Sequence, residues 1–258
     1  MPIRPKEVSG PLPIHKIEID KAALDALPAD VRRNFLLFGH IGNEINTLYR
    51  LVIFSMQAEE HPVMKLFAEC RGHTNARILI GTTHEGYLAV QKHILSQPFG
   101  QAYLPHMNRK GQAALKVVKR HLADTKLMAS IRNNFAFHLP YQEQIDAAYT
   151  KLPADIDLSI YSGKPRHSSL YNASLVMMTQ GMLDCADPDD KMTAEQAMSK
   201  IMDDAIKKSK ALNDFIEALL LTIVDRENLS PKETAEVVLT VDDHQSMISF
   251  RIPPLMRT

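Results

Sequence analysis

Few cysteines, few glycines, no net charge and no long apolar run characterise this sequence, and each shortage excludes a class of protein. Only two cysteines, Cys70 and Cys185, occur among 258 residues, which excludes a disulfide-rich secreted fold. No apolar run reaches the roughly 18 residues that cross a bilayer, and the N-terminal residues lack the apolar core of a signal peptide. We therefore expect a cytoplasmic protein in a reducing compartment, without a membrane-spanning segment.

The motifs that hold phosphates and metals are missing as well. Ten glycines in all provide no Gly-rich loop of the P-loop or dinucleotide-binding kind. Eleven histidines are present, but no HExxH motif, no pair of ExxH motifs and no CxxC motif occurs. A zinc site or a di-iron bundle therefore has no ligands at the required spacing. We expect no cofactor and no bound metal.

Charge is balanced overall but unevenly distributed. Thirty basic and thirty acidic residues cancel, so the protein as a whole has no electrostatic attraction to nucleic acid or to a membrane. Residues 109–132, however, contain seven Lys and Arg side chains against Asp124 alone, a local net charge of +6. Such a stretch favours a phosphate-bearing partner. The alternative is a solvated basic helix face that acidic residues elsewhere balance.

Apolar periodicity predicts a mainly α fold. Apolar residues recur at helical spacing in five segments, which are residues 30–58, 73–95, 111–137, 169–183 and 193–225. Alternation with period two is convincing only at 235–241 and 246–252, and the polar residues between these segments are typical of a hairpin turn. We predict a helical bundle with a small C-terminal β-hairpin.

This pattern also predicts three regions along the chain. Residues 1–27 are punctuated by proline and should form an extended N-terminal arm, in which the alternation at 16–20 indicates a short strand that joins the hairpin. Residues 28–225 should form the helical bundle domain, and residues 226–258 the hairpin extension.

The third predicted helix ends in an unusual polar segment. Its last residues read IRNNFAFHLP, and Pro140 ends the helix because it disfavours helical angles at Leu139. On an ideal helix, Asn134 and His138 are one turn apart and project within about 40° of Lys116 and Arg120. The residues predicted to bind nucleic acid are Lys116, Lys119, Arg120 and Asn134.

His138 and Arg132 are the candidate catalytic residues. In the last turn of a helix, unpaired carbonyls and the negative end of the dipole favour an imidazolium, and histidine exchanges protons near neutral pH. A nearby arginine holds a phosphodiester and stabilises charge in a transition state. On an ideal helix Arg132 projects about 120° away from His138, so a joint site requires a distorted last turn, a long reach or a second subunit. The alternative is that His138 is only a helix C-cap.

Arg132, five intervening residues and His138, with Asn133 directly after the arginine, resemble the Arg-x(4 to 6)-His motif of the HEPN superfamily (higher eukaryotes and prokaryotes nucleotide-binding). Many members of this superfamily are helical, metal-independent endoribonucleases, some of them toxins or defence proteins, in which the arginine and histidine of two subunits meet at a dimer interface. The resemblance implies that Arg132 contacts the phosphate and the transition state, that His138 is the general acid and base, and that Asn133 is a positioning residue.

The resemblance thus implies a homodimer that cleaves RNA by transesterification without metal, with an antitoxin as a candidate protein partner. A second hypothesis comes from a different class of protein. In it the chain is a non-catalytic helical interaction module that binds nucleic acid or a protein through the same face. Catalytically inactive members of such families exist, so the motif is compatible with both hypotheses.

Three further groups of residues each have two interpretations. On the first predicted helix, His40, Asn43, Glu44 and Thr47 form either a solvent face or a polar groove. The second offers Arg77, His84 and Glu85, of which the arginine and the carboxylate either orient other side chains or form a surface ion pair. The methionines either fill the core or form an adaptable partner surface; they are Met177, Met178, Met182, Met198 and Met202.

Overall fold

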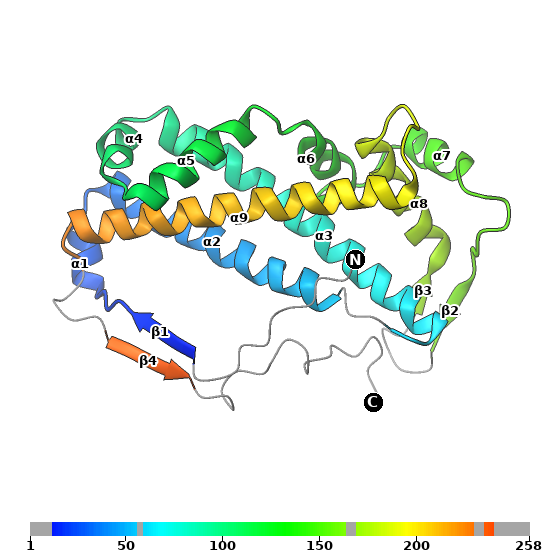
Figure 1. The fold of residues 1–258 in the computed structure, drawn as a ribbon, viewed down its shortest axis with the longest axis horizontal. Helices are drawn as coiled ribbons and strands as arrows, with labels where there is room; N and C mark the ends of the chain where they lie inside the picture. The colour runs from blue at the N-terminus through cyan, green and yellow to red at the C-terminus, as the bar shows by residue number, and fades with distance from the viewer. Residues whose placement is uncertain (1–11, 56–58, 164–168, 230–234, 240–258) are drawn as a thin grey trace. The chain divides into compact units, whose positions relative to one another are not determined.

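The computed structural model describes residues 12–55, 59–163, 169–229 and 235–239. Within these ranges the chain is mainly α-helical, with two small antiparallel sheets (Figure 1). The helices are α1 Lys21–Ala26, α2 Ala29–Ser55, α3 Pro62–Val90, α4 Pro98–Tyr103, α5 Arg109–Leu122, α6 Lys126–Ile131, α7 Gln142–Thr150, α8 Asn172–Ala186 and α9 Ala194–Arg226. The strands are β1 Leu12–Lys16, β2 Ile160–Ser162, β3 Ser169–Tyr171 and β4 Ala235–Leu239. The predicted fold class, mainly α with a small β element, is confirmed.

Three of the five long helices begin and end close to their predicted positions, namely α2, α8 and α9. Helix α3 begins at Pro62, well before the predicted start at residue 73. Proline suits the first turn of a helix because its missing N–H would be unpaired there in any case. The imidazole Nδ1 of His61 accepts from the N–H of Val63 at 3.2 Å and so pairs one of the free donors at this end. Residues 21–26, expected to be extended, form helix α1.

The helix predicted for residues 111–137 is interrupted, which corrects the sequence-based expectation. Helix α5 ends at Leu122 and α6 begins at Lys126. The side chain of Lys208, from α9, is buried here, and its ammonium donates to the carbonyl of Asp124 at 2.6 Å and to the carboxylate of Asp204 at 2.8 Å. Because the break separates α5 from α6, the ideal-helix alignment of Lys116 and Arg120 with the polar segment does not apply.

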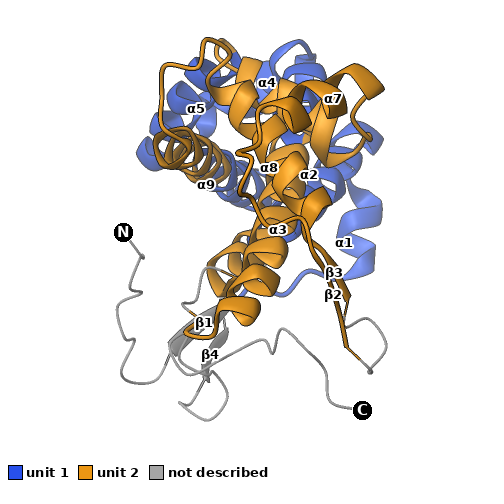
Figure 2. Cartoon of the chain, turned by 90° about the vertical axis from the view of Figure 1, so that its right-hand side faces the viewer, with its two compact units in different colours: residues 1–46, 86–122, 211–251 blue, residues 47–85, 123–210, 252–258 orange. Residues whose placement is uncertain are grey.

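The chain divides into two compact units, and three helices contribute residues to both (Figure 2). Of the described residues, unit 1 comprises 12–46, 86–122, 211–229 and 235–239. Unit 2 comprises 47–55, 59–85, 123–163 and 169–210. Each unit therefore combines segments that are far apart in the sequence, and the predicted boundaries near residues 27 and 225 remain predictions.

In unit 1, helices α2, α3 and α9 approach closely at Gly86. A Cβ atom there would lie 2.6 Å from Leu212 and 3.1 Å from Ile41, so glycine is required for this contact. Strand β4 pairs with β1 in antiparallel register, from Leu12 opposite Leu239 to Lys16 opposite Ala235. The predicted C-terminal strand is thus found at Ala235–Leu239, whereas the other half of the predicted hairpin, residues 246–252, lies outside the described residues.

Unit 2 has a core formed by α3, α6, α8 and α9. Its buried side chains include Ile80, Ile131, Phe135 and Ile201. Met182 is buried in this cluster, which confirms the core-filling interpretation for this methionine, and Met178 and Met198 pack against the cluster while partly exposed. Strands β2 and β3 form a small antiparallel pair in the same unit. Among the described residues, no helix has the length and apolar character that crossing a membrane requires.

Candidate functional site

The Arg-x5-His segment begins in a π-helical turn that continues α6. This turn covers Arg132–Ala136, and the N–H of Phe137 donates to the carbonyl of Arg132 at 3.3 Å. A π turn bonds residue i to residue i+5 and appears frequently at functional sites. Arg77 of α3 stabilises the turn, because its Nη1 donates to the carbonyl of Phe135 at 3.0 Å while its Nη2 donates to Thr74 Oγ1 at 3.3 Å. The end of this helix is therefore distorted from ideal geometry, which is one of the three arrangements that a joint site could use.

Two glycines allow neighbouring helices to press against this turn. A Cβ atom at Gly81 of α3 would lie 2.9 Å from the ring of Phe137 and 3.1 Å from the Cβ of Ala136. A Cβ atom at Gly181 of α8 would lie 2.5 Å from the ring of Phe135. Phe135 itself is only 4% exposed, so the turn is anchored in the core of unit 2. Neither glycine was identified from the sequence, because only the tertiary contact reveals its role.

The guanidinium of Arg132 is held by three groups. Its Nη2 lies 2.7 Å from the Oε1 of Glu85, and its Nη1 donates to the side-chain oxygen of Asn133 at 2.8 Å. The guanidinium carbon lies 5.9 Å from the centre of the Phe137 ring. The contact with Glu85 is an ion pair without hydrogen-bond geometry, so of the five N–H donors of the arginine only one is in a hydrogen bond among the described residues. The structure thus brings Arg132 and Asn133 together and places Glu85 beside them. A phosphate bound by Arg132 would either displace the Glu85 carboxylate or bind next to its negative charge.

His138 lies beyond the turn rather than in its last residues. The π turn ends at Ala136, and His138 is exposed in the connection to α7. Among the described residues no hydrogen bond joins its ring to Arg132 or to a helix carbonyl. The expected contact with the free carbonyls of the helix end is therefore not formed. An exposed imidazole is accessible to a substrate or to a second subunit.

Residues of α3 beside Glu85 form the buried side of the site. His84 is 7% exposed, and its Nδ1 has no hydrogen-bond partner among the described residues. Burial lowers the pKa of His84, an effect that Glu85 opposes and that Arg132 and Lys208 reinforce. The ring is therefore neutral at pH 7. The hydroxyl of Thr83 is also buried without a partner in this part of the structure.

The interpretation of Arg77 and Glu85 as orienting residues agrees with the structure better than a surface ion pair between them. Arg77 holds the backbone of the π turn and Glu85 holds Arg132. The sequence signal was the spacing of two turns along one predicted helix. The partners of both residues belong to a segment some fifty residues later, so the sequence did not identify them.

The residues predicted to bind nucleic acid do not form one helix face. Lys116, Lys119 and Arg120 are exposed on α5, which belongs to unit 1. Asn134 lies in the π turn of unit 2, where its Nδ2 is 3.5 Å from Ser130 Oγ. Lys119 and Arg120 also lie in the last turn of α5, where cations interact favourably with the helix dipole. Their exposure permits contact with phosphate, and their position gives them a structural role as well.

Exposed apolar side chains flank His138 on both sides. Phe137 is 46% exposed and Leu139 is 87% exposed. On α7 and its N-cap, Tyr141, Ile145 and Tyr149 recur every four residues, which places them on one side of the helix, and all three are exposed. Contiguous exposed apolar residues commonly mark interaction sites.

The polar stripe on α2 is a solvent face. His40, Asn43, Glu44 and Thr47 are all exposed, and His40 lies 3.3 Å from Glu44 one turn later. The alternative of a polar groove at this stripe is therefore not supported.

The comparisons with known proteins add no identification. No family model, no curated protein and no solved structure matches the chain. Within the described part of the chain, no group of three or more His, Cys, Asp or Glu side chains is arranged to hold a metal ion. The function must therefore be argued from the residues of the site.

Proposed function

We propose that this protein is a HEPN-type endoribonuclease in which Arg132, Asn133 and His138 act on RNA. The observation that carries the proposal is the fixed position of Arg132 at the first residue of a π turn. Glu85 and Asn133 hold its guanidinium, while the carbonyl of Phe135 in the same turn is bound by Arg77. Such positioning is what electrostatic stabilisation of a transition state requires, because the donors must be in place before charge develops.

The proposed reaction is transesterification of the RNA backbone. The 2'-hydroxyl attacks the adjacent phosphorus, so that the O2'–P bond forms and the P–O5' bond breaks. His138 accepts the proton of the 2'-hydroxyl, and a protonated histidine donates to the leaving 5'-oxygen. Arg132 stabilises the negative charge on the non-bridging oxygens in the transition state. The products are a 2',3'-cyclic phosphate and a 5'-hydroxyl.

In its simplest form this scheme uses two histidines, and a homodimer would supply both. One histidine would otherwise have to act as base and as acid within the same step. A two-fold axis near His138 places a second copy opposite the first, and it would cover the exposed side chains of Phe137, Leu139, Tyr141 and Tyr149. We propose that these residues form the dimer contact.

The remaining parts of the proposal concern partners and location. Lys116, Lys119 and Arg120 would contact RNA phosphates, and Asn134 would contact the backbone near the cleavage point. The protein would act in the cytoplasm as a toxin or defence protein, with an antitoxin as a protein partner. Each of these follows from the resemblance and from the local charge of +6 between residues 109 and 132.

A second candidate function is favoured by the ion pair of Arg132. Its guanidinium is already paired with Glu85 at 2.7 Å, as in an arginine whose role is structural. Exposed apolar residues beside it are also what a protein-binding surface requires. In this alternative the chain is a non-catalytic interaction module that binds nucleic acid or a protein.

Incubation of the purified protein with mixed-sequence RNA in EDTA separates the two functions. We expect fragments that end in 2',3'-cyclic phosphate. His138→Ala should lower the rate by roughly 10²–10⁴, the usual contribution of proton transfer, and Arg132→Lys should lower it as well because lysine lacks the planar fork of donors. His106→Ala, which changes an exposed histidine of unit 1, is the matched control and should cleave at the wild-type rate. RNA that stays intact with folded wild-type protein would favour the interaction module.

A further inference from the structure

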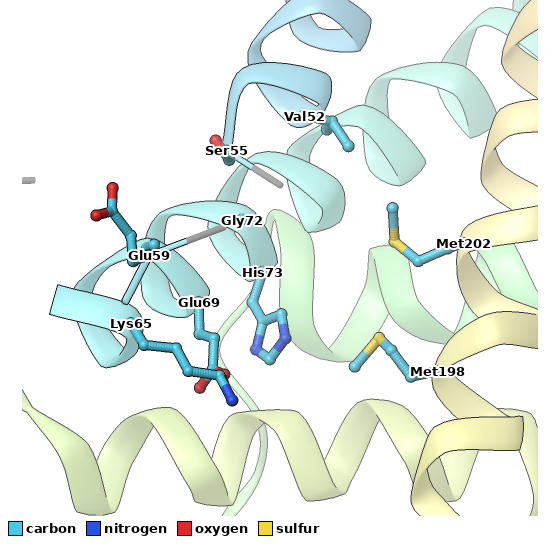
Figure 3. A pocket seen from close by; sticks show the side chains of 10 residues that line it. Val52, Ser55, Glu59, Lys65, Glu69, Gly72, His73, Met198 and Met202 are labelled. Carbon is cyan, nitrogen blue, oxygen red and sulfur yellow. The ribbon is translucent and has the colours of Figure 1, made fainter. Parts of the chain in front are cut away.

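A pocket of about 510 Å³ lies in unit 2, away from the site around Arg132 (Figure 3). Pockets of roughly 300–1,000 Å³ hold small-molecule ligands in proteins. The end of α2, the first half of α3 and the beginning of α9 provide its wall. The principal wall residues are Val52, Ala68, Gly72, His73, Met198 and Met202.

The imidazole of His73 belongs to this wall and has one nitrogen that can accept a hydrogen bond. Its Nδ1 lies 2.8 Å from Thr179 Oγ1, and the Thr179 hydroxyl donates to the carbonyl of Leu175 at 2.8 Å. The hydroxyl proton is therefore in use, so the Thr179 oxygen accepts from Nδ1–H. In a neutral imidazole with a protonated Nδ1, the Nε2 atom carries the lone pair. Burial, reinforced by the charge of Arg77, lowers the pKa of His73, which keeps the ring neutral at pH 7.

The other polar group deep in the wall is already satisfied. Ser55 Oγ donates to the carbonyl of Leu51 at 2.7 Å and accepts from Asn75 Nδ2 at 2.8 Å. For the His73 ring, by contrast, the hydrogen bond found among the described residues is the one through Nδ1, and none is found for Nε2. A ligand donor at this position would therefore gain a directional bond inside a mainly apolar pocket.

The charges at the rim select the ligand. The rim carries two carboxylates, Glu59 and Glu69, and one ammonium, Lys65, which lies 3.9 Å from Glu69. Carboxylates are therefore in excess, which disfavours the binding of an anion. In Figure 3 the imidazole of His73 lies between the Lys65 and Glu69 side chains and the two methionines of α9. Methionine thioethers adapt to the ligand shape and make favourable contacts with aromatic rings.

We propose that this pocket binds a small neutral or cationic aromatic molecule whose N–H or O–H group donates to Nε2 of His73. The bound ring would contact Met198 and Met202, and the donor would face α3. This site does not depend on RNA cleavage, because none of its wall residues belongs to the segment between Arg132 and His138.

Titration with N-phenyl-1-naphthylamine tests the proposal. This neutral probe has an apolar aromatic body and one N–H donor, and its fluorescence rises in an apolar environment. We expect saturable binding of one probe per chain. Met202→Trp should weaken binding at least tenfold because the larger side chain occupies the pocket. His73→Phe should weaken it about fivefold, or about 1 kcal/mol, the usual value of one hydrogen bond.

Two controls isolate the pocket. Met192→Trp changes an exposed methionine that does not line the pocket, and His106→Phe changes an exposed histidine of unit 1; both should bind the probe as the wild type does. Thermal unfolding followed by circular dichroism identifies variants that remain folded. The proposal is overturned if the folded wild-type protein shows no saturable binding. It is also overturned if folded Met202→Trp binds the probe with unchanged affinity, because the probe would then occupy another apolar surface.

Discussion

Replacement of Lys208 by methionine tests the origin of the break between α5 and α6. The Lys208 side chain is 1% exposed, yet it carries an ammonium that donates to the Asp124 carbonyl and to the Asp204 carboxylate. Methionine has a similar length and no charge, so the variant removes the ammonium with little change in packing. Asp124 lies in the connection that the ammonium holds, and α6 leads directly into the π turn of the candidate site.

The expected loss follows from these two bonds. A hydrogen bond to a charged group contributes about 1.5–3 kcal/mol, and removing one partner of a buried ion pair costs about 3–5 kcal/mol. Two features of the site reduce the loss. The Asp204 side chain is 24% exposed, so water reaches the carboxylate in the variant, and methionine avoids the desolvation cost of a buried ammonium. We therefore expect the free energy of unfolding to fall by about 3 kcal/mol, the lower end of that range.

Urea unfolding followed by circular dichroism measures this loss. The midpoint should fall while the slope with urea stays the same, because both proteins expose similar surface on unfolding. Lys207→Met is the matched control: Lys207 is adjacent and exposed, so its loss should be within about 0.5 kcal/mol. A loss below about 1 kcal/mol for Lys208→Met would refute the reasoning, since the two bonds would then contribute less than one ordinary buried polar contact.

Three further predictions concern the π turn and the buried His84. If Glu85 positions Arg132, Glu85→Ala should lower the rate of RNA cleavage by roughly tenfold or more. Glu85→Gln keeps an acceptor oxygen and should lower the rate less. Equal rates in both variants and the wild type would contradict this role. Gly181→Ala should destabilise the fold by about 1–3 kcal/mol through the contact with Phe135, whereas Gly39→Ala, where a Cβ finds no atom closer than 4.0 Å, should stabilise it by up to about 1 kcal/mol in urea unfolding. The pKa of His84 is lowered in the folded state, so as the pH falls below about 6.5 the unfolded chain binds the proton first, and the free energy of unfolding decreases until the pH reaches the folded pKa. His84→Gln should therefore lose less stability than the wild type between pH 7 and pH 5. An equal loss would contradict the assignment.

The long helices were predictable because their positions depend on local sequence. Helices α8 and α9 follow apolar periodicity over many turns, and Thr193 caps α9 through its side chain, with Gln196 returning a bond to the Thr193 N–H. Helix α7 was not predicted, because it has only nine residues and so offers few turns over which a periodic pattern could be recognised.

The interruption at residues 123–125 was not predictable from the segment itself. Residues 111–137 have continuous helical periodicity, and the group that stabilises the break is the ammonium of Lys208, more than eighty residues later. A lysine in a long helix normally indicates an exposed position. Its burial becomes evident only when α9 packs beside the connection, so local propensity was overridden by a tertiary contact.

The π turn shows how such contacts change a functional interpretation as well as a fold. On an ideal helix Arg132 and His138 project in different directions, so their joint action requires a distorted turn, a long reach or a second subunit. The structure distorts the end of this helix, because Arg77 binds the carbonyl of Phe135 and the glycines of α3 and α8 leave space for the two aromatic rings. Arg132 then stays beside Glu85 in a partly exposed position, while His138 lies in an exposed connection flanked by apolar residues. A fixed arginine and an accessible histidine have the complementary properties that a composite site requires, because the arginine must hold a charge in place and the histidine must reach protons on a bound substrate.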